Sequence, residues 1–428
     1  MKEFLTHNAP VFSSCFILLM LGNIDPVLGS VVLAGIMLIW AIRERNNWLI
    51  LMFACTLILG DSRLYFFLPF KGMRYVAISI LFLKTVYDIA RGRYGVNRLL
   101  FLSIPFFIVA FFGVAVSPVK GVAIAKAISY LFLLIICLSF APYYFRKGRH
   151  RLLFNLLHLA ILVYILGILF LVLNPSWAYL NDRYRGFFGN PNGLGTFSTM
   201  MIPFAVMMLN RFPEKKRAAF VLIGLGFFSI ILSESRTALG TTSLFFALYL
   251  IYKGGKLRRN FFWFFGLPII VFIFMVVPLE TLVGLVGLEE FLRVESLKTG
   301  TGRFLAWGLG LTEIQNNLWI GRGFGYEEHF FYQLREFLVA TEHQGGMHNS
   351  YLTFLMNNGI LGSIPFAIFL IVLFRKVKIK KFAFPFIIVV LISANFESWL
   401  NSSLNAFTFF FFVILSFLIS YKTLKPKI

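Results

Sequence analysis

A histidine-containing stretch borders one of the long apolar runs of the chain. The segment EHQGGMHNSYLTFLMNNGILG, residues 342–362, holds two of the six histidines and then becomes mostly apolar. His348 precedes Asn349 and Ser350, either of which can cap a helix, whereas histidine is a poor cap. A neutral imidazole, with an ordinary pKa of about 6.5, can accept a hydroxyl proton. We therefore predict His348 as a general base and place Asn349 among the substrate-binding residues.

Two other interpretations of these residues stay open. His348 could be a structural histidine at the membrane interface, or it could bind a metal together with Glu342 and His343. The spacing of the three matches no strong metal-binding motif, and the chain has no DxD of the kind used by metal-dependent nucleotide-sugar enzymes. We predict neither a metal nor a cofactor.

Arginines between the apolar runs are the second set of candidates. A guanidinium matches phosphate bidentately and stays charged at neutral pH. An arginine within the membrane costs about 2.5–3.5 kcal/mol on insertion scales, so it needs a partner. Several arginines converging on a cavity would suit a lipid-linked diphosphate. The alternative is pairing with nearby acids, such as Glu234 for Arg236, Asp182 for Arg183, and Glu290 or Glu295 for Arg293. The arginines concerned are Arg63, Arg74, Arg183, Arg185, Arg236, Arg293, Arg303, Arg322 and Arg335.

The segment GNPNGLG, residues 189–195, stands directly before an apolar run. Asparagine caps helices and proline suits the first turn, so a capping motif is the favoured interpretation. A helix N-terminus is also an anion site. Because no strand precedes it, the segment is not a dinucleotide-binding fingerprint.

The elements that must position these residues are membrane-spanning helices. Hydrophobic residues make up 59% of the 428-residue chain, charged residues only 14%, and the mean hydropathy is +0.82. Many apolar runs approach the roughly 20 residues that span a bilayer, and the short alternating segments of a β-barrel are absent. We predict an all-α polytopic bundle of 12–14 spans. The expected spans are 11–24, 27–42, 48–60, 72–90, 99–116, 121–141, 152–173, 191–210, 218–233, 237–252, 261–278, 349–373, 382–394 and 404–421.

The distribution of charge predicts the orientation of the bundle. The net charge is +22, and alternate connections together with both termini hold 27 of the 40 Lys and Arg but only 4 of the 18 acids. This asymmetry is the positive-inside rule, so both termini are expected in the cytoplasm and nucleic acid is not an expected partner. Attraction to anionic membrane lipids follows. The candidate arginines and His348 are thereby expected on the outer face.

Three regions follow from the hydropathy. They are an N-terminal bundle at 1–278, a large outer loop at 279–348 with amphipathic helices, and C-terminal spans at 349–428. The three cysteines, Cys15, Cys55 and Cys137, lie in apolar spans and are interpreted as small buried residues. Without a cleavage-site pattern, the first span is expected to remain as an anchor.

Four motifs in this order resemble the O-antigen ligase and O-antigen polymerase family, which includes exopolysaccharide polymerases. They are RYRGFFGNPNGLGTF, ILSESRTALG, TGRFLAWGLGLTEIQNNLWIGRGFG and MHNSYLTFLMNNGILGSIPF, and the resemblance runs from about residue 180 to the end of the chain. It implies metal-independent, inverting transfer of a glycan from undecaprenyl diphosphate to an acceptor hydroxyl. The expected location is the periplasmic face of a bacterial inner membrane.

The resemblance also implies roles for individual residues. His348 matches the family's loop histidine, proposed as base, and Arg236 and Arg303 match its essential arginines, expected to hold the diphosphate. Arg185, and more weakly Arg74, correspond to other basic positions of the family. We add Arg183 and Arg322 as candidate substrate-binding residues.

The sequence leaves the acceptor open. A polymerase passes the chain to the next lipid-linked repeat, whereas a ligase passes the finished glycan to lipid A–core. The residues of three of these segments, SESRTAL, TGR and GRGFGYEEHF, favour an exopolysaccharide-type polymerase. A transporter of lipid-linked sugars is the alternative from another class, but it predicts ionisable residues in mid-membrane. The spans carry few such residues, Lys126 being a partial exception.

Overall fold

The computed structural model describes residues 1–146, 150–263, 303–340 and 346–420, and these residues are almost entirely helical. Seven helical stretches are long and apolar enough to cross a membrane, and four shorter apolar helices accompany them in the same described residues. Each expected span that lies in these ranges corresponds to a helix, which confirms the all-α polytopic bundle. The expected span at 261–278 falls mostly outside the described residues.

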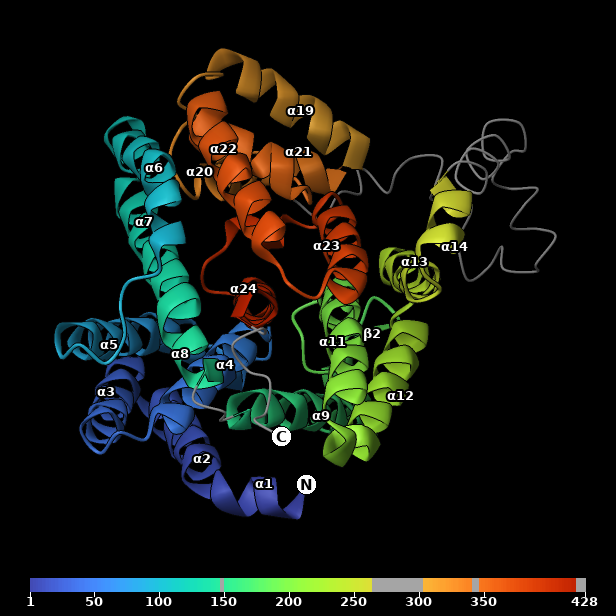
Figure 1. The fold of residues 1–428 in the computed structure, drawn as a ribbon. Helices are drawn as coiled ribbons and strands as arrows, with labels where there is room; N and C mark the ends of the chain where they lie inside the picture. The colour runs from blue at the N-terminus through green and yellow to red at the C-terminus, as the bar shows by residue number, and fades with distance from the viewer. Residues whose placement is uncertain (147–149, 264–302, 341–345, 421–428) are drawn as a thin grey trace.

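The N-terminal half supplies the first series of helices, shown from blue to green in Figure 1. Each predicted span begins or ends within a few residues of a helix end, because hydropathy sets the length of the helix. The helices are α1 (Lys2–His7), α2 (Ala9–Ile24), α3 (Pro26–Ile42), α4 (Asn46–Asp61), α5 (Phe70–Ala90), α6 (Ile104–Val116), α7 (Lys120–Ile135), α8 (Ala141–Arg146) and α9 (Arg151–Leu173). A π-helical turn, Ile136–Phe140, joins α7 to α8.

The second half begins with a small hairpin between α9 and α11. Tyr179–Leu180 (β1) pairs antiparallel with Arg183–Tyr184 (β2), and the two turn residues, Asn181 and Asp182, both have positive φ. Asn and Asp tolerate that conformation, which a two-residue hairpin turn requires. The remaining elements are α10 (Pro175–Ala178), α11 (Pro191–Arg211), α12 (Lys216–Ser233), α13 (Arg236–Lys253), α14 (Lys256–Phe261), α19 (Arg303–Asn316), α20 (Tyr326–Gln333), α21 (Arg335–Ala340), α22 (Ser350–Lys376), α23 (Lys380–Ala394) and α24 (Ala406–Ser420).

Two helices, α11 and α24, form the interior of the bundle. The apolar stretch of α11 is 89% buried inside the protein. Nearly every residue of α24 is buried as well. Small residues let neighbours approach α11 closely, as helix packing in membranes requires. A Cβ added at Gly195 would overlap Ser235, just before α13, and one at Gly226 of α12 would press on Ile202 of α11. The N-terminus of α11 is therefore held tightly against the start of α13.

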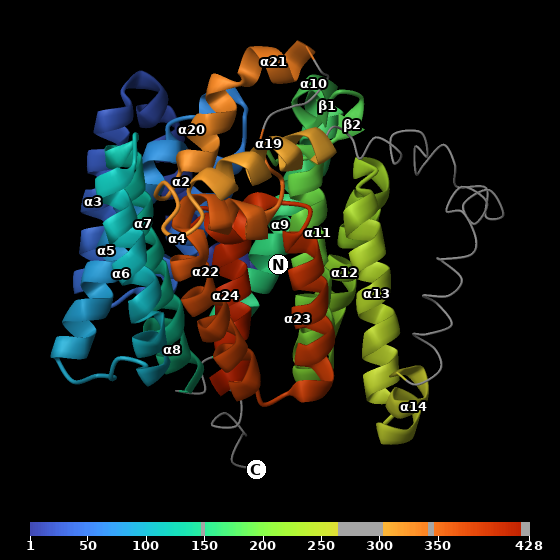
Figure 2. The same cartoon turned by 90° about the horizontal axis from the view of Figure 1, so that it is seen from above.

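The bundle has two chemically different ends, which Figure 2 shows from the side. The α19, α20 and α21 helices and the β1–β2 hairpin lie at the upper end, and α8, α14 and the α22–α23 connection lie at the lower end. Among the described residues, the lower end carries the basic runs KGGKLRR, at α14, and RKVKIKK, at the α22–α23 connection. These two basic runs, which the sequence analysis assigns to one side of the membrane, therefore lie at the same end of the bundle.

The helices α19 and α20 are attached to α22 at a break in that helix. Gly359 has a φ of 58° inside α22, and the freed backbone groups bond to the segment between α19 and α20. The amides of Ile360 and Leu361 donate to the carbonyls of Leu318 and Trp319 at 2.8 and 3.0 Å. Gly323 donates to Asn357 at 2.7 Å in return. The residues 303–340, where the sequence predicts helices in the large loop, form α19, α20 and α21, while GLEEFLRVESL lies outside the described residues.

We predict that Gly359→Ala detaches α19 and α20 from α22. The added Cβ would overlap the Trp319 carbonyl, and alanine is disfavoured at positive φ. The expected loss is about 2 kcal/mol or more of unfolding free energy, measured as a lowered thermal midpoint of the purified protein. Gly240→Ala, in α13 with open space around its Cβ, is the matched control. Equal midpoints for the two variants would contradict the docking role of Gly359.

Candidate functional site

His348 lies in the last turn before α22, and its backbone is fixed on both sides. The Met347 amide donates to Glu327 Oε1 at 2.7 Å, and the Asn349 amide donates to Ser398 Oγ at 3.1 Å. His348 itself has a φ of 46°, a left-handed conformation that costs a non-glycine residue of order 1–3 kcal/mol. The two flanking hydrogen bonds hold the histidine in this strained position, which aims the imidazole at Glu397.

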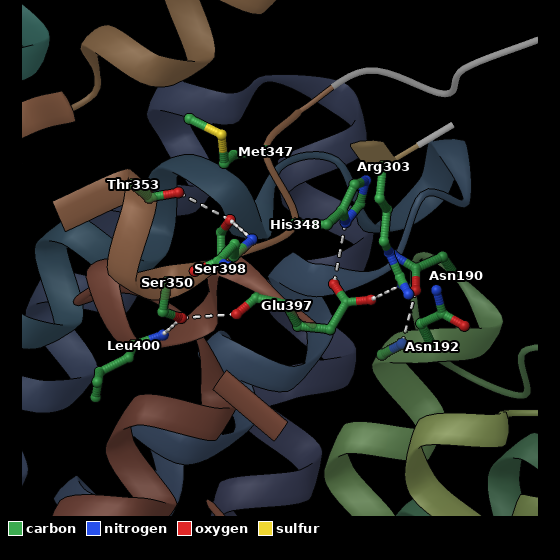
Figure 3. A network of polar contacts seen from close by, with 12 residues as sticks. Asn190, Asn192, Arg303, Met347, His348, Ser350, Thr353, Glu397, Ser398 and Leu400 are labelled. Carbon is green, nitrogen blue, oxygen red and sulfur yellow. Dashed lines mark hydrogen bonds and ion pairs between the residues drawn. The ribbon is translucent and has the colours of Figure 1, made fainter. Parts of the chain in front are cut away.

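Glu397 is the centre of the site. It follows α23, and its Oε2 lies 3.2 Å from His348 Nδ1, while its Oε1 lies 3.7 Å from Arg303 Nη2, at the start of α19. The side chains are largely buried, with 17% of Glu397, 19% of Arg303 and 30% of His348 exposed. Figure 3 shows the carboxylate between the imidazole and the guanidinium. One acid therefore contacts two candidate catalytic residues from different parts of the chain.

Electrostatics within this group favour an ionised carboxylate and a basic imidazole. Burial disfavours both charged forms, but the charge and hydrogen bond of Glu397 outweigh it and raise the pKa of His348 above 6.5. The reverse interaction, with help from Arg303 and Asn192, lowers the pKa of Glu397 below 4.5 despite burial. A histidine whose Nδ1 faces a carboxylate is held in the tautomer in which Nε2 accepts protons.

The N-terminus of α11 adds polar groups to the same site. Asn190 Oδ1 accepts from the Gly193 amide at 2.6 Å, which confirms the predicted cap, and Asn192 contributes to the lowering of the Glu397 pKa. Arg183 Nη2 donates to Asn192 Oδ1 at 3.2 Å and to the Ser233 carbonyl at 2.8 Å. Arg183 thereby ties the β2 strand, α11 and the end of α12 together beside Glu397.

Arg236 begins α13 in the same neighbourhood. The turn before it contains Glu234, with a φ of 47°, and the carbonyl of Glu234 accepts from Arg183 at 3.3 Å. Ser235, the residue preceding Arg236, contacts Gly195 of α11. The half-buried Arg236 thus starts its helix at the end of α11 that carries Asn192. We name His348, Glu397, Arg303, Asn192, Arg183 and Arg236 the His348–Glu397 site.

A second basic group lies on the other side of the α11 N-terminus. Asp61 ends α4, accepts from the Gly189 amide at 3.3 Å and interacts electrostatically with Arg63, Lys71 and Arg74. Arg185 is 7% exposed, and burial together with the charge of Arg63 lowers its pKa. We name Asp61, Arg63, Lys71, Arg74 and Arg185 the Asp61 cluster. It holds four cations and one acid.

The other predicted residues have different surroundings. Asn349 Oδ1 caps α22 by accepting from Tyr351 and Leu352, so its side chain serves the helix. Arg322 lies beside Glu313, with Nε 3.8 Å from Oε1, and over the ring of Tyr326. Arg335 is an exposed residue of α21. Arg293, Glu342 and His343, with the acids Glu290 and Glu295, lie outside the described residues.

Sequence reasoning missed Glu397, Asn192 as a site residue, and Glu327. One signal could have identified the first, since Glu397 is the only acid in the sequence after residue 342 and stands between two apolar runs. Glu327 is buried, and burial raises its pKa while the Met347 amide opposes the shift. Nothing in the local sequence distinguishes Glu327 from Glu328, which pairs instead with Lys126 of α7 at 2.5 Å.

The fold and the site together define a multi-pass helical membrane protein with a buried histidine–carboxylate pair and several arginines at one end of its bundle. Residues 218–367, from within α12 to within α22, match the family model described as O-antigen ligase. Over this part of the chain the sequence is similar to O-antigen ligases, and the similarity supports a membrane enzyme of glycan assembly. A comparison with curated proteins found no match. The matched region contains Arg236, Arg303 and His348, whereas Glu397 and Asn192 lie outside it.

Proposed function

We propose that the protein transfers a glycan from undecaprenyl diphosphate to an acceptor hydroxyl on the periplasmic face of a bacterial inner membrane. The observation that carries the proposal is the contact of Glu397 with both His348 and Arg303 at the end of the bundle opposite the basic connections. A base and a phosphate-binding cation are the two groups that a displacement of diphosphate by a hydroxyl needs.

The reaction begins with proton removal by His348. Nδ1 faces Glu397, and Nε2 accepts the proton of the acceptor hydroxyl as its oxygen attacks the anomeric carbon. Attack from the face opposite the diphosphate forms the new glycosidic bond, breaks the bond to the phosphate oxygen and inverts the configuration. The proton remains on the imidazolium, whose charge Glu397 balances, as the buried carboxylate does in other histidine-based catalysts.

The leaving diphosphate is stabilised by arginines. Arg303 and Arg236 are proposed to bind it directly, and Arg183 supports them from β2. Fixed guanidinium groups in a partly buried site are effective there because the charge develops as the bond breaks. Arg74 and Arg185 are proposed substrate contacts from the Asp61 cluster, while Arg322 and Asn349 have structural partners of their own. No step in this mechanism uses a metal or cofactor.

The contacts of Lys126 weigh against the transporter alternative. Lys126, the basic residue within a predicted span, pairs with Glu328 of α20. It therefore lies at the same end of the bundle as the proposed site, since α20 lies at the upper end in Figure 2. A carrier of lipid-linked sugars would be expected to place ionisable groups near the membrane midplane. Between a polymerase and a ligase, the residues of the motifs favour the polymerase.

We predict that His348→Ala and Arg236→Ala each reduce transfer by at least about a hundredfold, because one loses the base and the other a diphosphate contact. The measurement is glycan transfer from synthetic undecaprenyl diphosphate donor by purified protein, with EDTA present. Arg335→Gln, which changes an exposed arginine of α21, is the control and should keep full activity. Full activity in either alanine variant would remove that residue from the mechanism.

The pH dependence provides a separate test of Glu397. Transfer needs neutral His348, whose pKa is raised, so the rate should fall as the pH drops through a value above 6.5. In Glu397→Gln, burial and the charge of Arg303 lower the pKa of His348. The acid side of the pH–rate profile should therefore move to lower pH. The plateau rate should also fall by about a hundredfold or more, because the imidazole loses its orientation. A pH–rate profile whose acid side does not move in Glu397→Gln would contradict the pairing of His348 with Glu397.

The product separates polymerase from ligase. Deleting the gene in the source bacterium should leave single-repeat chains on the cell surface if the protein is a polymerase. Unattached polymer together with bare lipid A–core would show a ligase. Gel electrophoresis of lipopolysaccharide, combined with recovery of exopolysaccharide, distinguishes these outcomes, and the polymerase proposal expects the single-repeat result.

A further inference from the structure

An apolar groove runs along the outside of the N-terminal bundle and ends at the Asp61 cluster. It has a volume of about 580 Å³ and lies between α2, α4 and α9, with an end against the start of α5. Its walls are almost entirely aliphatic and aromatic, and Ser13 is the hydroxyl residue among them. Phe16, on its rim, is 62% exposed, so the groove opens toward the membrane around the protein. Along α9 it extends from Leu159 to Phe170, a rise of about 16 Å.

The upper end of the groove is aromatic and adjoins the cations. Phe67 and Phe187 pack together at 4.8 Å between ring centroids, and Phe187 stacks on Phe170 at 5.5 Å. Phe67 and Phe70 stand in the chain between Arg63 and Lys71, and Phe187 follows Arg185 by two residues. The Asp61 cluster therefore lies directly beyond the apolar end, with Arg63 and Lys71 exposed.

We infer that this groove and the Asp61 cluster bind a second lipid-linked diphosphate, with its polyprenyl chain along α2, α4 and α9 and its diphosphate on Arg63, Lys71, Arg74 and Arg185. The inference rests on the proposed polymerase function and names the place where its lipid-linked acceptor would bind. The Asp61 cluster reaches the His348–Glu397 site within four residues, since Gly189 bonds Asp61 and Asn192 acts electrostatically on Glu397. Two lipid-linked sugars held there would bring their glycans together.

Charge decides which lipid fits this groove. Within the membrane, a lipid tail gains little by leaving other tails for an equally apolar groove, so the walls contribute position rather than selectivity. The affinity must come from the rim, where four cations face one carboxylate. A diphosphate carries more charge than the headgroup of a monoanionic phospholipid and suits the guanidinium geometry. A diphosphate-linked polyprenyl chain therefore matches both parts of the site.

Protection of Cys15 tests the inference. Cys15 lines the groove and is half-buried, and replacing Cys55 and Cys137 by alanine leaves it as the single cysteine. The full-length protein in phosphatidylcholine nanodiscs is treated with N-ethylmaleimide, and labelling is followed by intact mass spectrometry. Undecaprenyl diphosphate should slow labelling about tenfold, whereas undecaprenol, inorganic diphosphate and phosphatidylglycerol at the same concentration should not. Equal protection by undecaprenol or phosphatidylglycerol would overturn the inference.

The rim is tested by the double variant Arg63→Gln/Arg185→Gln. It should weaken protection by about tenfold or more, because each lost charge-assisted hydrogen bond contributes to the affinity. Native mass spectrometry gives a second readout, with two bound undecaprenyl diphosphates expected in the unmodified chain and one in the double variant. Arg335→Gln should behave as the unmodified chain. A double variant that keeps protection and both lipids would overturn the assignment.

The same measurements in His348→Ala separate this inference from the proposed reaction. That variant is expected to lose transfer and to retain protection of Cys15, since its histidine lies outside the groove. Retained transfer with retained protection would contradict only the catalytic proposal. Lost transfer without protection by undecaprenyl diphosphate would contradict only the second lipid site.

Discussion

The site depends on one buried carboxylate. Glu397 contacts His348 and Arg303 directly, and through Asn192 it is linked to Arg183. These residues come from the loop before α22, the start of α19, the N-terminus of α11 and β2, so one acid organises four parts of the chain. Removing one partner from a buried pair costs on the order of 3–5 kcal/mol, because the other charge is left uncompensated. The carboxylate therefore allows cations to remain at the end of an apolar bundle.

Hydropathy predicted the helical fold because lipid imposes one requirement on every span. Backbone groups must bond within the segment, so each apolar run between polar connections becomes a helix. The same signal gives no information on departures from regularity. The left-handed Gly359 inside α22 and the π-helical turn at Ile136–Phe140 both lie within apolar runs. Gly359 is explained by its tertiary contacts with Leu318 and Trp319, and hydropathy does not encode such contacts.

Residues of the candidate site could be predicted where the neighbouring sequence alone explains why they stand at that position. His348 precedes a span that it does not cap, and Arg236 lies in a connection too short for a solvated surface pair. In the structure His348 stands two residues before α22 and Arg236 begins α13. Glu397 pairs across 49 residues, and its role as a charge partner depends on the fold. GNPNGLG gave the cap at Asn190, while the rotation of the first turn determines that Asn192 faces Glu397. Arg183 and Arg185 look equivalent in the sequence, yet the hairpin directs them to different groups.

This division of the arginines has a physical consequence for glycan transfer. The N-terminus of α11 stands between the two basic groups, with Gly189 bonded to Asp61 on one side and Asn192 acting electrostatically on Glu397 on the other. Two diphosphates bound at neighbouring sites would repel each other. Separate sets of basic residues, each with its own acid, compensate the two charges independently. The positive end of the α11 dipole between them favours both anions at once. The geometry therefore suits a reaction in which both substrates carry phosphate, and one departs while the other stays bound.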